Sequence, residues 1–478
     1  MTRLEILSIT TPERKQVFAK ILGEEKWNHS DYVRCKDGDH IFDFTFAFSI
    51  EEAVAQSRAK AWDAAVLDCD CGLNYLRFIN IITSVPFHQR HLSCPKVLCF
   101  FLAESVTSDT LLSLGKLNIG DVFISGGSDF YQRLRKVALP EKKGKTALCC
   151  AGGGIEGLIY EIGSLRALDE SLVGSSIIDF DLFYGISAGA IMASSLANGI
   201  PPIELARAFM QDSTILSSIS PGKLFDPAFS EFARALIHSF SATAFTSESL
   251  IHKLFRAVPN AFFKGDIIEK VVEKTFSLPG MTNSFKELGH SLFIGATDQD
   301  TYEHIVFGTE GWDDVPVSRA IHASMSLIPF YTPQYINGRW FIDGSYTRTS
   351  EIELAIEHGA TLIVVTDPLV PVRSAQSGFV KSKGGVFASI QGLKALINTR
   401  FMGMLPHLAD QHPEVDIIVF IPKEDDMKIM SGSPLKLNFQ VEIERISYEE
   451  TRTRMQEESQ RITRAFERHG FELQGLRK

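Results

Sequence analysis

Two glycine-rich turns constrain the fold of this chain more than any other feature of its sequence. The first, Gly152–Gly157, follows the apolar run Ala147-Leu148-Cys149-Cys150. The second, Gly185–Gly189, follows Phe180-Asp181-Leu182-Phe183-Tyr184. Residues with a helical pattern follow both turns. A strand-length run, a tight turn and a helix make one β–α unit, and successive units of this kind build a parallel sheet covered by helices. The sequence therefore predicts an α/β fold.

A charged stretch, Pro140-Glu141-Lys142-Lys143-Gly144-Lys145, separates two regions of strand–helix alternation. A chain of 478 residues is long enough for two or three domains. Domain boundaries usually fall in polar linkers of this kind. We therefore expect a first domain over residues 1–139, a linker over 140–145 and a second domain over 146–478.

The first region predicts a small doubly wound, flavodoxin-like domain. Helical patterns lie at Pro12–Leu22 and Ile50–Lys60, between strand-length apolar runs. The expected strands are Leu4–Ile9, Phe42–Phe48, Ala64–Leu67, Val97–Leu102 and Val122–Ile124. This region resembles the receiver domain of response regulators over about 135 residues.

The resemblance places Asp68 at the position of the phosphorylated aspartate. Receivers carry acidic residues for Mg²⁺ after the first strand, where this chain has Thr10-Thr11. They carry a lysine after the fifth strand, where it has Ser125-Gly126-Gly127. A phosphoryl group needs nearby cations to offset its charge. We expect this domain to regulate or to contact a protein partner or a second copy, without phosphotransfer.

The first glycine turn can supply backbone donors to an anion. Consecutive glycines allow positive φ and close approach to a ligand, and the free N–H groups at the start of the following helix favour negative charge. The turn also matches the G-x-G-x-x-G dinucleotide fingerprint, which by itself is weak, and a purely structural turn is a further alternative. A dinucleotide site would need an acidic residue at the end of the next strand, where Tyr184-Gly185 stands.

The second glycine turn contains a serine in the G-x-S-x-G pattern of a nucleophile elbow. Ser187 stands between an apolar strand and the helical run Ala190–Leu196, which is the strand–turn–helix context of that motif. A serine needs a base to become nucleophilic. In a Ser–His–Asp hydrolase a histidine should follow the acid, but none of the candidates lies in a loop that the sequence ties to this turn. These candidates are His358, His407, His412 and His469. Asp343, which precedes Gly344 and follows the strand Trp340–Ile342, is the better candidate, although an Asp-Gly pair alone also suits a plain hairpin turn.

These motifs give the chain from about Lys145 onward a resemblance to the patatin-like phospholipases. The glycine turn, the serine turn and Asp343-Gly344 occur in the order of that family, and Leu292–Asp298 and Ala323–Phe330 resemble two further family segments. The resemblance implies a three-layer α/β/α hydrolase domain that uses a Ser–Asp dyad on acyl esters of lipids, without metal or cofactor. It assigns Ser187 as nucleophile and Asp343 as base. It further implies an oxyanion hole at Gly152, Gly153 and Gly154, with turns supported by Gly157, Gly185, Gly189 and Gly344.

The chain departs from the family pattern at two places. Glu156 stands where an Arg or Lys is usual, and Ser345-Tyr346 follows the Asp-Gly pair where the family usually has Gly or Ala and then Asn. Two alternatives therefore stay open beside a lipid acyl hydrolase. One is a soluble esterase or thioesterase, and the other is a catalytically silent binding protein with a patatin-like shell.

Charge and composition narrow the partners. The net charge of −10 opposes nucleic acid and anionic lipid, so membrane contact needs a local basic or apolar patch. Residues 368–409 contain no Asp or Glu, and a helix there would have an apolar face and a basic one, with Phe401 and Arg400 as representatives. We expect transient membrane contact through about residues 373–405. An ordinary core helix with a solvated edge is the alternative.

The N-terminal sequence lacks a long apolar segment of the secretory type. The seven cysteines are odd in number and irregular in spacing, which is typical of reduced thiols. We therefore expect a cytoplasmic protein that is peripheral at the inner membrane surface. Cys69, Cys71, His88, His91 and Cys94 are possible zinc ligands, but their spacing does not match a regular zinc site, so we expect no metal.

Overall fold

The computed structural model divides into two compact units. It describes residues 2–14, 32–38, 40–60, 62–84, 92, 96–102, 107–117, 119–125, 130–138, 144–209, 261–423 and 437–475. The first unit comprises residues 1–143, 402–416 and 458–468, and the second comprises residues 144–401, 417–457 and 469–478. The first boundary falls in the predicted linker, whose residues 140–143 lie outside the described ranges. The two later segments of the first unit lie in what the sequence suggests is a continuous second domain.

A six-stranded sheet forms the centre of the first unit. Its strand order is β2-β3-β1-β4-β5-β6, with β2 antiparallel to β3 and the remaining neighbours parallel. The strands are β1 (Thr2–Ile9), β2 (Tyr32–Asp37), β3 (His40–Ala47), β4 (Ala64–Asp68), β5 (Val97–Phe101) and β6 (Asp121–Ile124). Apart from the extra edge strand β2, this is the doubly wound order of flavodoxin-like folds. The sequence does not predict β2, because Tyr32–Asp37 contains three charged residues.

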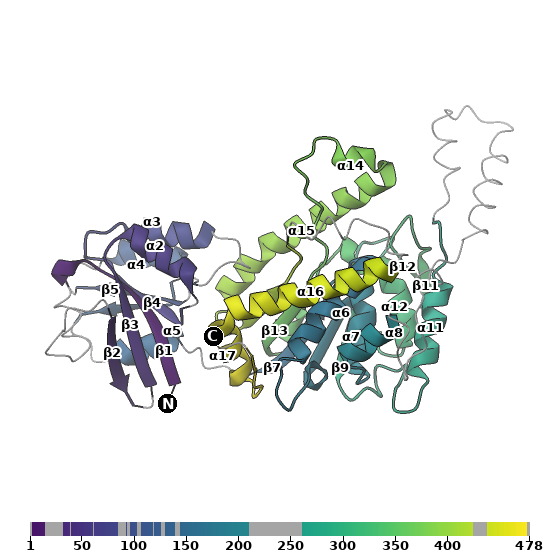
Figure 1. Ribbon diagram of the computed structural model, residues 1–478, viewed down its shortest axis with the longest axis horizontal. Coiled ribbons are helices and arrows are strands. Elements are labelled where there is room, and N and C mark those ends of the chain that lie inside the picture. Colours follow the sequence, from purple (N-terminus) through teal and green to yellow (C-terminus); the bar gives the residue numbers. More distant parts are fainter. Residues whose placement is uncertain are drawn as a thin grey trace. The chain divides into compact units, whose positions relative to one another are not determined.

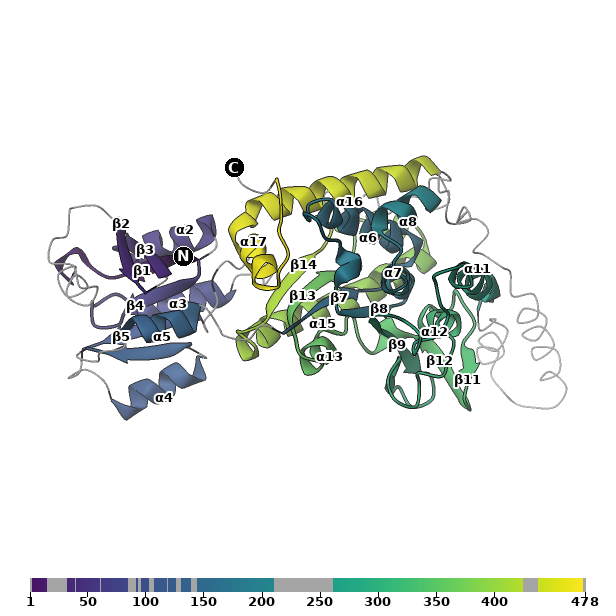
Figure 2. The same ribbon diagram turned by 90° about the horizontal axis from the view of Figure 1, so that it is seen from below.

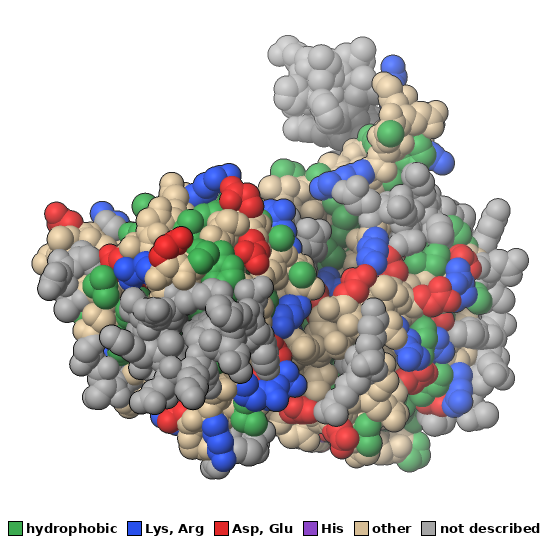
Figure 3. Space-filling model, turned by 60° about the vertical axis from the view of Figure 1, so that its left-hand side comes forward, with side chains coloured by type: hydrophobic (Ala, Val, Ile, Leu, Met, Phe, Trp, Pro, Cys, Tyr) green, Lys and Arg blue, Asp and Glu red, His purple; other side chains and the backbone are tan. Residues whose placement is uncertain are grey.

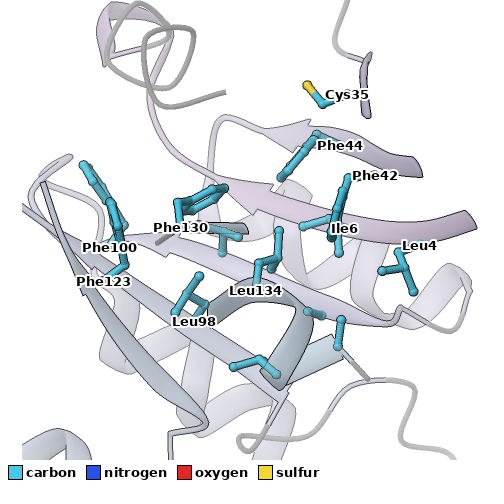
Figure 4. Packing of buried hydrophobic residues seen from close by; sticks show 14 of the residues in the cluster. Leu4, Ile6, Cys35, Phe42, Phe44, Leu98, Phe100, Phe123, Phe130 and Leu134 are labelled. Carbon is cyan, nitrogen blue, oxygen red and sulfur yellow. The ribbon is translucent and has the colours of Figure 1, made fainter. Parts of the chain in front are cut away.

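Helices cover both faces of this sheet because its parallel strands are apolar on both sides. They are α2 (Ile50–Ala59), α3 (Tyr75–Ser84), α4 (Ser108–Lys116) and α5 (Phe130–Ala138). Leu4 and Ile6 of β1 pack with Phe130 and Leu134 of α5 in one aromatic-rich core (Figure 4). Leu7 and Ile9 point to the opposite face, where α2, α3 and α4 pack.

The C-terminal helix α17 (Ser459–Arg468) belongs to the first unit. Its Arg464 forms an ion pair with Asp63 and donates a hydrogen bond to the backbone carbonyl of Arg3 (3.0 Å). The charged, amphipathic pattern of Tyr448–His469 is typical of one continuous helix. The structure instead has two, α16 (Leu437–Glu457) and α17, and only α16 belongs to the second unit.

The second unit is built on an eight-stranded sheet with a parallel centre. The order is β11-β12-β9-β8-β7-β13-β14, and β10 pairs with β9 beside this path. The strands are β7 (Lys145–Cys150), β8 (Leu182–Ile186), β9 (Ser291–Asp298), β10 (His304–Phe307), β11 (Gln334–Ile336), β12 (Arg339–Asp343), β13 (Ala360–Thr366) and β14 (Asp416–Phe420). The strands β13, β7, β8 and β9 run parallel, whereas β12 and β10 run antiparallel to β9.

Helices lie on both sides of this sheet and make three layers (Figures 1 and 2). Figure 2 shows α6 (Gly154–Asp169), α7 (Ala188–Ala197) and α16 on one side, and α13 (Ile352–Glu357) and α15 (Gly385–Gln411) on the other. The remaining described helices of this unit are α8 (Pro202–Phe209), α11 (Asp266–Phe276), α12 (Val317–Ser324) and α14 (Phe379–Ser382). The predicted α/β fold class is confirmed. Residues 201–275 have apolar side chains at helical spacing, but most of them lie outside the described residues, which here resume at Ala261.

Residues 373–390 project from the second unit. Figure 1 shows α14 and the first turns of α15 standing away from the sheet, and Figure 3 shows hydrophobic and basic side chains together on this segment, at the top of the view. Val386 is 56% exposed, and Lys383 lies 5.4 Å from the ring centre of Phe379. Further along α15, Phe401 is fully buried, so this side chain fits the core-helix alternative and not a membrane-facing surface.

Every helix in the described ranges is either too short or too polar to cross a bilayer.

Candidate active site

Ser187 occupies a sharp turn between β8 and α7. Its backbone has φ 54° and ψ −125°, outside the usual regions for an L-residue. Such strain persists only where the surroundings hold it, and it is common at functional sites. The Ser187 N–H donates to Ser324 Oγ (2.8 Å), and Ser324 Oγ donates to the Gly295 carbonyl (2.6 Å). This relay ties the turn to β9.

Two glycines let the elbow pack tightly. A methyl group on Gly185 would lie 2.5 Å from Ala190 Cα, and one on Gly189 would lie 2.3 Å from the Cys150 carbonyl oxygen. Either contact would force the backbone to move. The glycines of the G-x-S-x-G pattern are therefore required by close approach of α7 to β8 and to the end of β7.

Asp343 reaches the same edge of the sheet from the antiparallel strand β12. Strand β9 lies between β8 and β12, with Gly295 opposite Ile186 and Ala296 opposite Asp343. The register therefore brings the ends of β8 and β12 to one level of the sheet, although Ser187 and Asp343 are far apart in sequence. A side chain on Gly344 would lie 2.4 Å from the Gly295 carbonyl oxygen, so only glycine fits there.

Burial and hydrogen bonds set the acidity of Asp343. Burial raises its pKa to about 6, while hydrogen bonds from the Ser187 side chain and from Ser345 oppose the rise. The Ser345 N–H donates to Asp343 Oδ1 at 2.8 Å. A carboxylate with this pKa is ionised at neutral pH and still basic enough to accept a proton.

The first glycine turn lies directly beside the serine. A methyl group on Gly152 would lie 2.7 Å from Ser345 Oγ and 3.0 Å from Ser187 Cβ. The turn after β7, the elbow after β8 and the turn after β12 therefore meet at one point. These are three of the segments that the sequence analysis selected.

The next glycines start helix α6. Gly154 has φ 64°, a left-handed conformation that favours glycine. Methyl groups on Gly153 and Gly157 would lie 2.6 Å and 2.9 Å from Pro368 Cγ, so the turn packs against the segment after β13. The first N–H groups of a helix have no acceptor within the helix. Those at the start of α6 are consequently available to an anion.

Glu156, in the first turn of α6, lies in a charged cluster. Burial raises its pKa to about 7, against the attraction of Lys394 on α15. Burial also raises the pKa of Asp367 to about 6, and Lys394 opposes this shift too. The basic group near this glycine turn is therefore supplied by α15 and not by position 156.

Sequence reasoning assigned no role to several residues that hold the site. Ser324 Oγ accepts a hydrogen bond from the Ser187 N–H. Asp343 is held through its backbone: its N–H donates to the Ser326 carbonyl (3.1 Å), and its carbonyl accepts from Thr297 Oγ1 (3.0 Å). Ser324 and Ser326 lie in Ala323–Phe330, a segment noted only for its resemblance. No short sequence pattern indicates their hydrogen-bonding roles, because serine and threonine are common in turns.

Asp68, in the first unit, is fully engaged by neighbouring side chains. Arg14 donates to both carboxylate oxygens (2.6 and 2.8 Å), and Thr10 Oγ1 donates to one of them (2.8 Å). Such a bidentate pair is among the strong charge-assisted interactions. Arg14 thus neutralises the Asp68 carboxylate.

Among the described residues, no group of three His, Cys, Asp or Glu side chains is placed to hold a metal ion. Cys69 and Cys71 are free thiols, whereas His88, His91 and Cys94 lie outside the described ranges.

Comparison with known proteins identifies a family for part of the second unit. Residues 148–356 match the model of the family described as patatin-like phospholipase. Among solved structures, VipD from Legionella pneumophila matches at 13% identity over 66% of this chain and 67% of its own, with a TM-score of 0.33. The type III effector protein ExoU matches at 14% identity over 66% of this chain and 53% of its own, with a TM-score of 0.29.

The family match contains both glycine turns and Asp343, and it supports lipid hydrolase activity. Residues 148–356, less than half of the chain, are therefore similar to the patatin-like phospholipase family.

Proposed function

We propose that this protein is a serine acyl hydrolase that cleaves acyl esters of lipids with a Ser187–Asp343 dyad. The main support is the convergence at Gly152, beside both Ser187 and the turn that follows Asp343. A second support is that the Ser187 side chain lowers the pKa of Asp343 against the effect of burial, as expected of two groups that interact without an intervening imidazole.

The reaction has two steps. In the first, Ser187 Oγ attacks the ester carbonyl carbon while Asp343 accepts the hydroxyl proton. The tetrahedral oxyanion accepts hydrogen bonds from N–H groups of the Gly152–Gly154 turn, each worth about 3 kcal/mol. The carbon–oxygen bond to the alcohol then breaks, and the alcohol leaves with the proton from Asp343.

In the second step, water attacks the acyl-enzyme and gives its proton to Asp343. The fatty acid leaves as Ser187 Oγ recovers that proton. General-base assistance of this kind typically contributes about 10²- to 10⁴-fold. The cycle consumes one ester and one water and releases one alcohol and one fatty acid.

Fatty-acid release and covalent labelling test the dyad. Ser187→Ala should abolish both hydrolysis and labelling by a fluorophosphonate, and Asp343→Asn should reduce hydrolysis at least 100-fold. Ser277→Ala, at an exposed serine that ends α11, is the matched control and should behave as wild type. Full activity in the Ser187 or Asp343 variant would refute the dyad.

A panel of substrates separates the alternatives. A lipid hydrolase should prefer long-chain phospholipid or lysophospholipid over short soluble esters and thioesters. A soluble esterase or thioesterase should show the reverse order. Absence of turnover and of fluorophosphonate labelling in folded wild-type protein would favour a binding protein instead.

We further propose that the projecting segment 373–390, together with the exposed side of α15 as far as Leu396, touches the membrane surface, which would place the protein at the inner face of the membrane. The support is the absence of acidic residues over 368–409 together with exposed Val386 and the exposed apolar Leu396 on α15. Interfacial segments combine apolar and basic groups in this way.

Vesicle flotation tests this contact. Val386→Glu combined with Leu396→Glu should lower binding to phosphatidylglycerol vesicles and hydrolysis of vesicle lipid, but leave hydrolysis of a short soluble ester unchanged. Val173→Glu, at another exposed apolar side chain of the same unit, is the control. Equal flotation of both variants and wild type would exclude docking through this segment.

For the first unit we propose a regulatory or partner-binding role without phosphotransfer. The support is the Arg14–Asp68 ion pair, which occupies the carboxylate oxygens. Acetyl phosphate with Mg²⁺ should leave Asp68 unlabelled. Stoichiometric labelling would overturn the proposal.

A further inference from the structure

Helix α15 contacts the turn that carries Asp343 through one arginine. Arg400 Nη2 donates to the Ser345 carbonyl (2.9 Å) and to Thr349 Oγ1 (3.1 Å), and Nη1 donates to the Tyr346 carbonyl (3.0 Å). The Thr349 hydroxyl in turn donates to the Ile397 carbonyl (3.4 Å). The planar, forked donor set of a guanidinium suits several acceptors at once.

The turn that Arg400 holds also orients the catalytic carboxylate. Ser345 is bonded on both sides, because its N–H donates to Asp343 Oδ1 (2.8 Å) while its carbonyl accepts from Arg400. Its hydroxyl oxygen lies where a methyl group on Gly152 would clash. A displacement of Ser345 would therefore disturb the Asp343 carboxylate and the packing of the glycine turn together.

The packing of α15 fixes where Arg400 can reach. Lys394, Ile397 and Phe401 are buried at the spacing of one helix face, and Arg400 emerges beside them. On the opposite side of Asp343, Thr297 Oγ1 donates to the Asp343 carbonyl and Thr347 Oγ1 donates to the Gly344 carbonyl (3.3 Å). The sheet thus holds the start of the turn, and α15 holds its end.

We propose that Arg400 is a positioning residue for Asp343, acting through hydrogen bonds to the Ser345–Thr349 loop. The inference rests on the proposed Ser187–Asp343 dyad. The contribution is geometric: the hydrogen bonds run to neutral backbone carbonyls and a hydroxyl, and the charged group that acts on Arg400 is another cation, Arg348. A positive charge at position 400 without the forked guanidinium should therefore be insufficient to position Asp343.

The test compares Arg400→Gln and Arg400→Lys on a short soluble ester, which does not require membrane contact. Both variants should lower kcat about 10- to 100-fold with little change in KM, because lysine retains the charge but not the fork. The acid limb of the kcat/KM profile should also move to higher pH. The reason is that the Ser345 N–H bond keeps the Asp343 pKa down, and a loosened turn weakens that bond.

A milder variant and a control complete the design. Thr349→Val removes one acceptor of Arg400 at similar volume, and it should lower kcat and shift the pH limb by less than Arg400→Gln. Arg445→Gln, at an exposed arginine of α16 paired with Glu442 and Glu449, should leave kcat unchanged. If the Arg400 variants do not fold, the kcat and pH profile of Thr349→Val test the positioning role instead.

Wild-type kcat and pH limb in folded Arg400→Gln would overturn the proposal, as would full rescue by Arg400→Lys. Where the Arg400 variants do not fold, a wild-type Thr349→Val would do the same. The dyad is judged separately from Ser187→Ala and Asp343→Asn. Inactive dyad variants together with a normal Arg400→Gln would reject only the positioning role, whereas active dyad variants would reject the dyad itself.

Discussion

At the scale of single residues, the proposed reaction depends on the acidity of Asp343. Burial raises its pKa to about 6, and only the ionised form can accept the Ser187 proton. We therefore expect kcat/KM on a soluble ester to rise with pH, with a midpoint near 6 and a plateau above neutrality. A profile that is flat from pH 5 to 8 would contradict the role of Asp343 as base. Protein stability over the same range should be measured in parallel, since unfolding at low pH would mimic the limb.

Because of the same burial, ionisation of Asp343 lowers the free energy of unfolding. A carboxyl whose folded pKa is raised contributes stability that is fully present below its unfolded pKa of about 3.8 and is lost as pH rises through about 6. A rise of about two pH units corresponds to about 3 kcal/mol at pH 8. Asp343→Asn should therefore increase the free energy of unfolding at pH 8, by up to this amount, while it reduces hydrolysis at least 100-fold.

Asp298 on β9 provides the opposite control in urea denaturation. Burial there is outweighed by N–H bonds from Thr301 and Asp300 and by Arg339, so the pKa of Asp298 is lowered. Its contribution is present above the unfolded pKa and is lost as pH falls through the folded one. Asp298→Asn should reduce stability at pH 8. Destabilisation by both substitutions would contradict the proposed cost at Asp343.

At the scale of elements, the site depends on close approach of turns to strands. Gly189→Ala and Gly344→Ala each place a methyl group within 2.4 Å of a backbone carbonyl oxygen. We expect each to reduce the free energy of unfolding by about 1–3 kcal/mol, as overpacking does, and to reduce activity further by moving the turn. Urea denaturation followed by circular dichroism measures the first effect.

Gly392→Ala is the matched control within α15. A methyl group there would have nothing within 4 Å, and Gly392 is exposed. Alanine in a helix interior is favoured over glycine by about 0.5–1 kcal/mol, so this variant should be more stable than wild type. Equal effects of all three substitutions would show that helix and turn propensity, and not close packing, governs these positions.

At the scale of the whole molecule, segments that are far apart in the sequence belong to the same compact unit. The first unit takes α17 from the far end of the sequence, and Arg464 of that helix pairs with Asp63. Asp63 is 8% exposed and also accepts the Glu5 N–H (2.6 Å). A double-mutant cycle of Asp63→Ala and Arg464→Ala should give a coupling energy of about 1–3 kcal/mol.

The exposed pair Glu442–Arg445 on α16 is the reference for this cycle and should couple by less than about 0.5 kcal/mol. Coupling of the Asp63–Arg464 pair no larger than the reference would argue against a stable place for α17 in the first unit.

Much of the architecture follows from short stretches of sequence. Apolar runs such as Thr361–Val365 predict buried parallel strands because these need no polar face, and the structure places β13 there. The edge strand β2 cannot be predicted in this way, since its alternating charged residues also suit a loop. The break between α16 and α17 cannot be predicted either, because Glu457-Glu458-Ser459 contains no glycine or proline that would indicate a helix end.

The local chemistry of this chain was decided by neighbours in sequence. Glycine spacing and the strand–turn–helix pattern select Ser187, and the Asp-Gly pair selects Asp343, since backbone strain and tight turns restrict which residues fit. The meeting of these groups was decided by packing. Only the register of β9 between β8 and β12, and the seating of α15, bring Gly152, Ser187, Ser345 and Arg400 together. Contacts between segments 30 to 250 residues apart depend on how whole elements pack, and no short pattern around Arg400 encodes its partners.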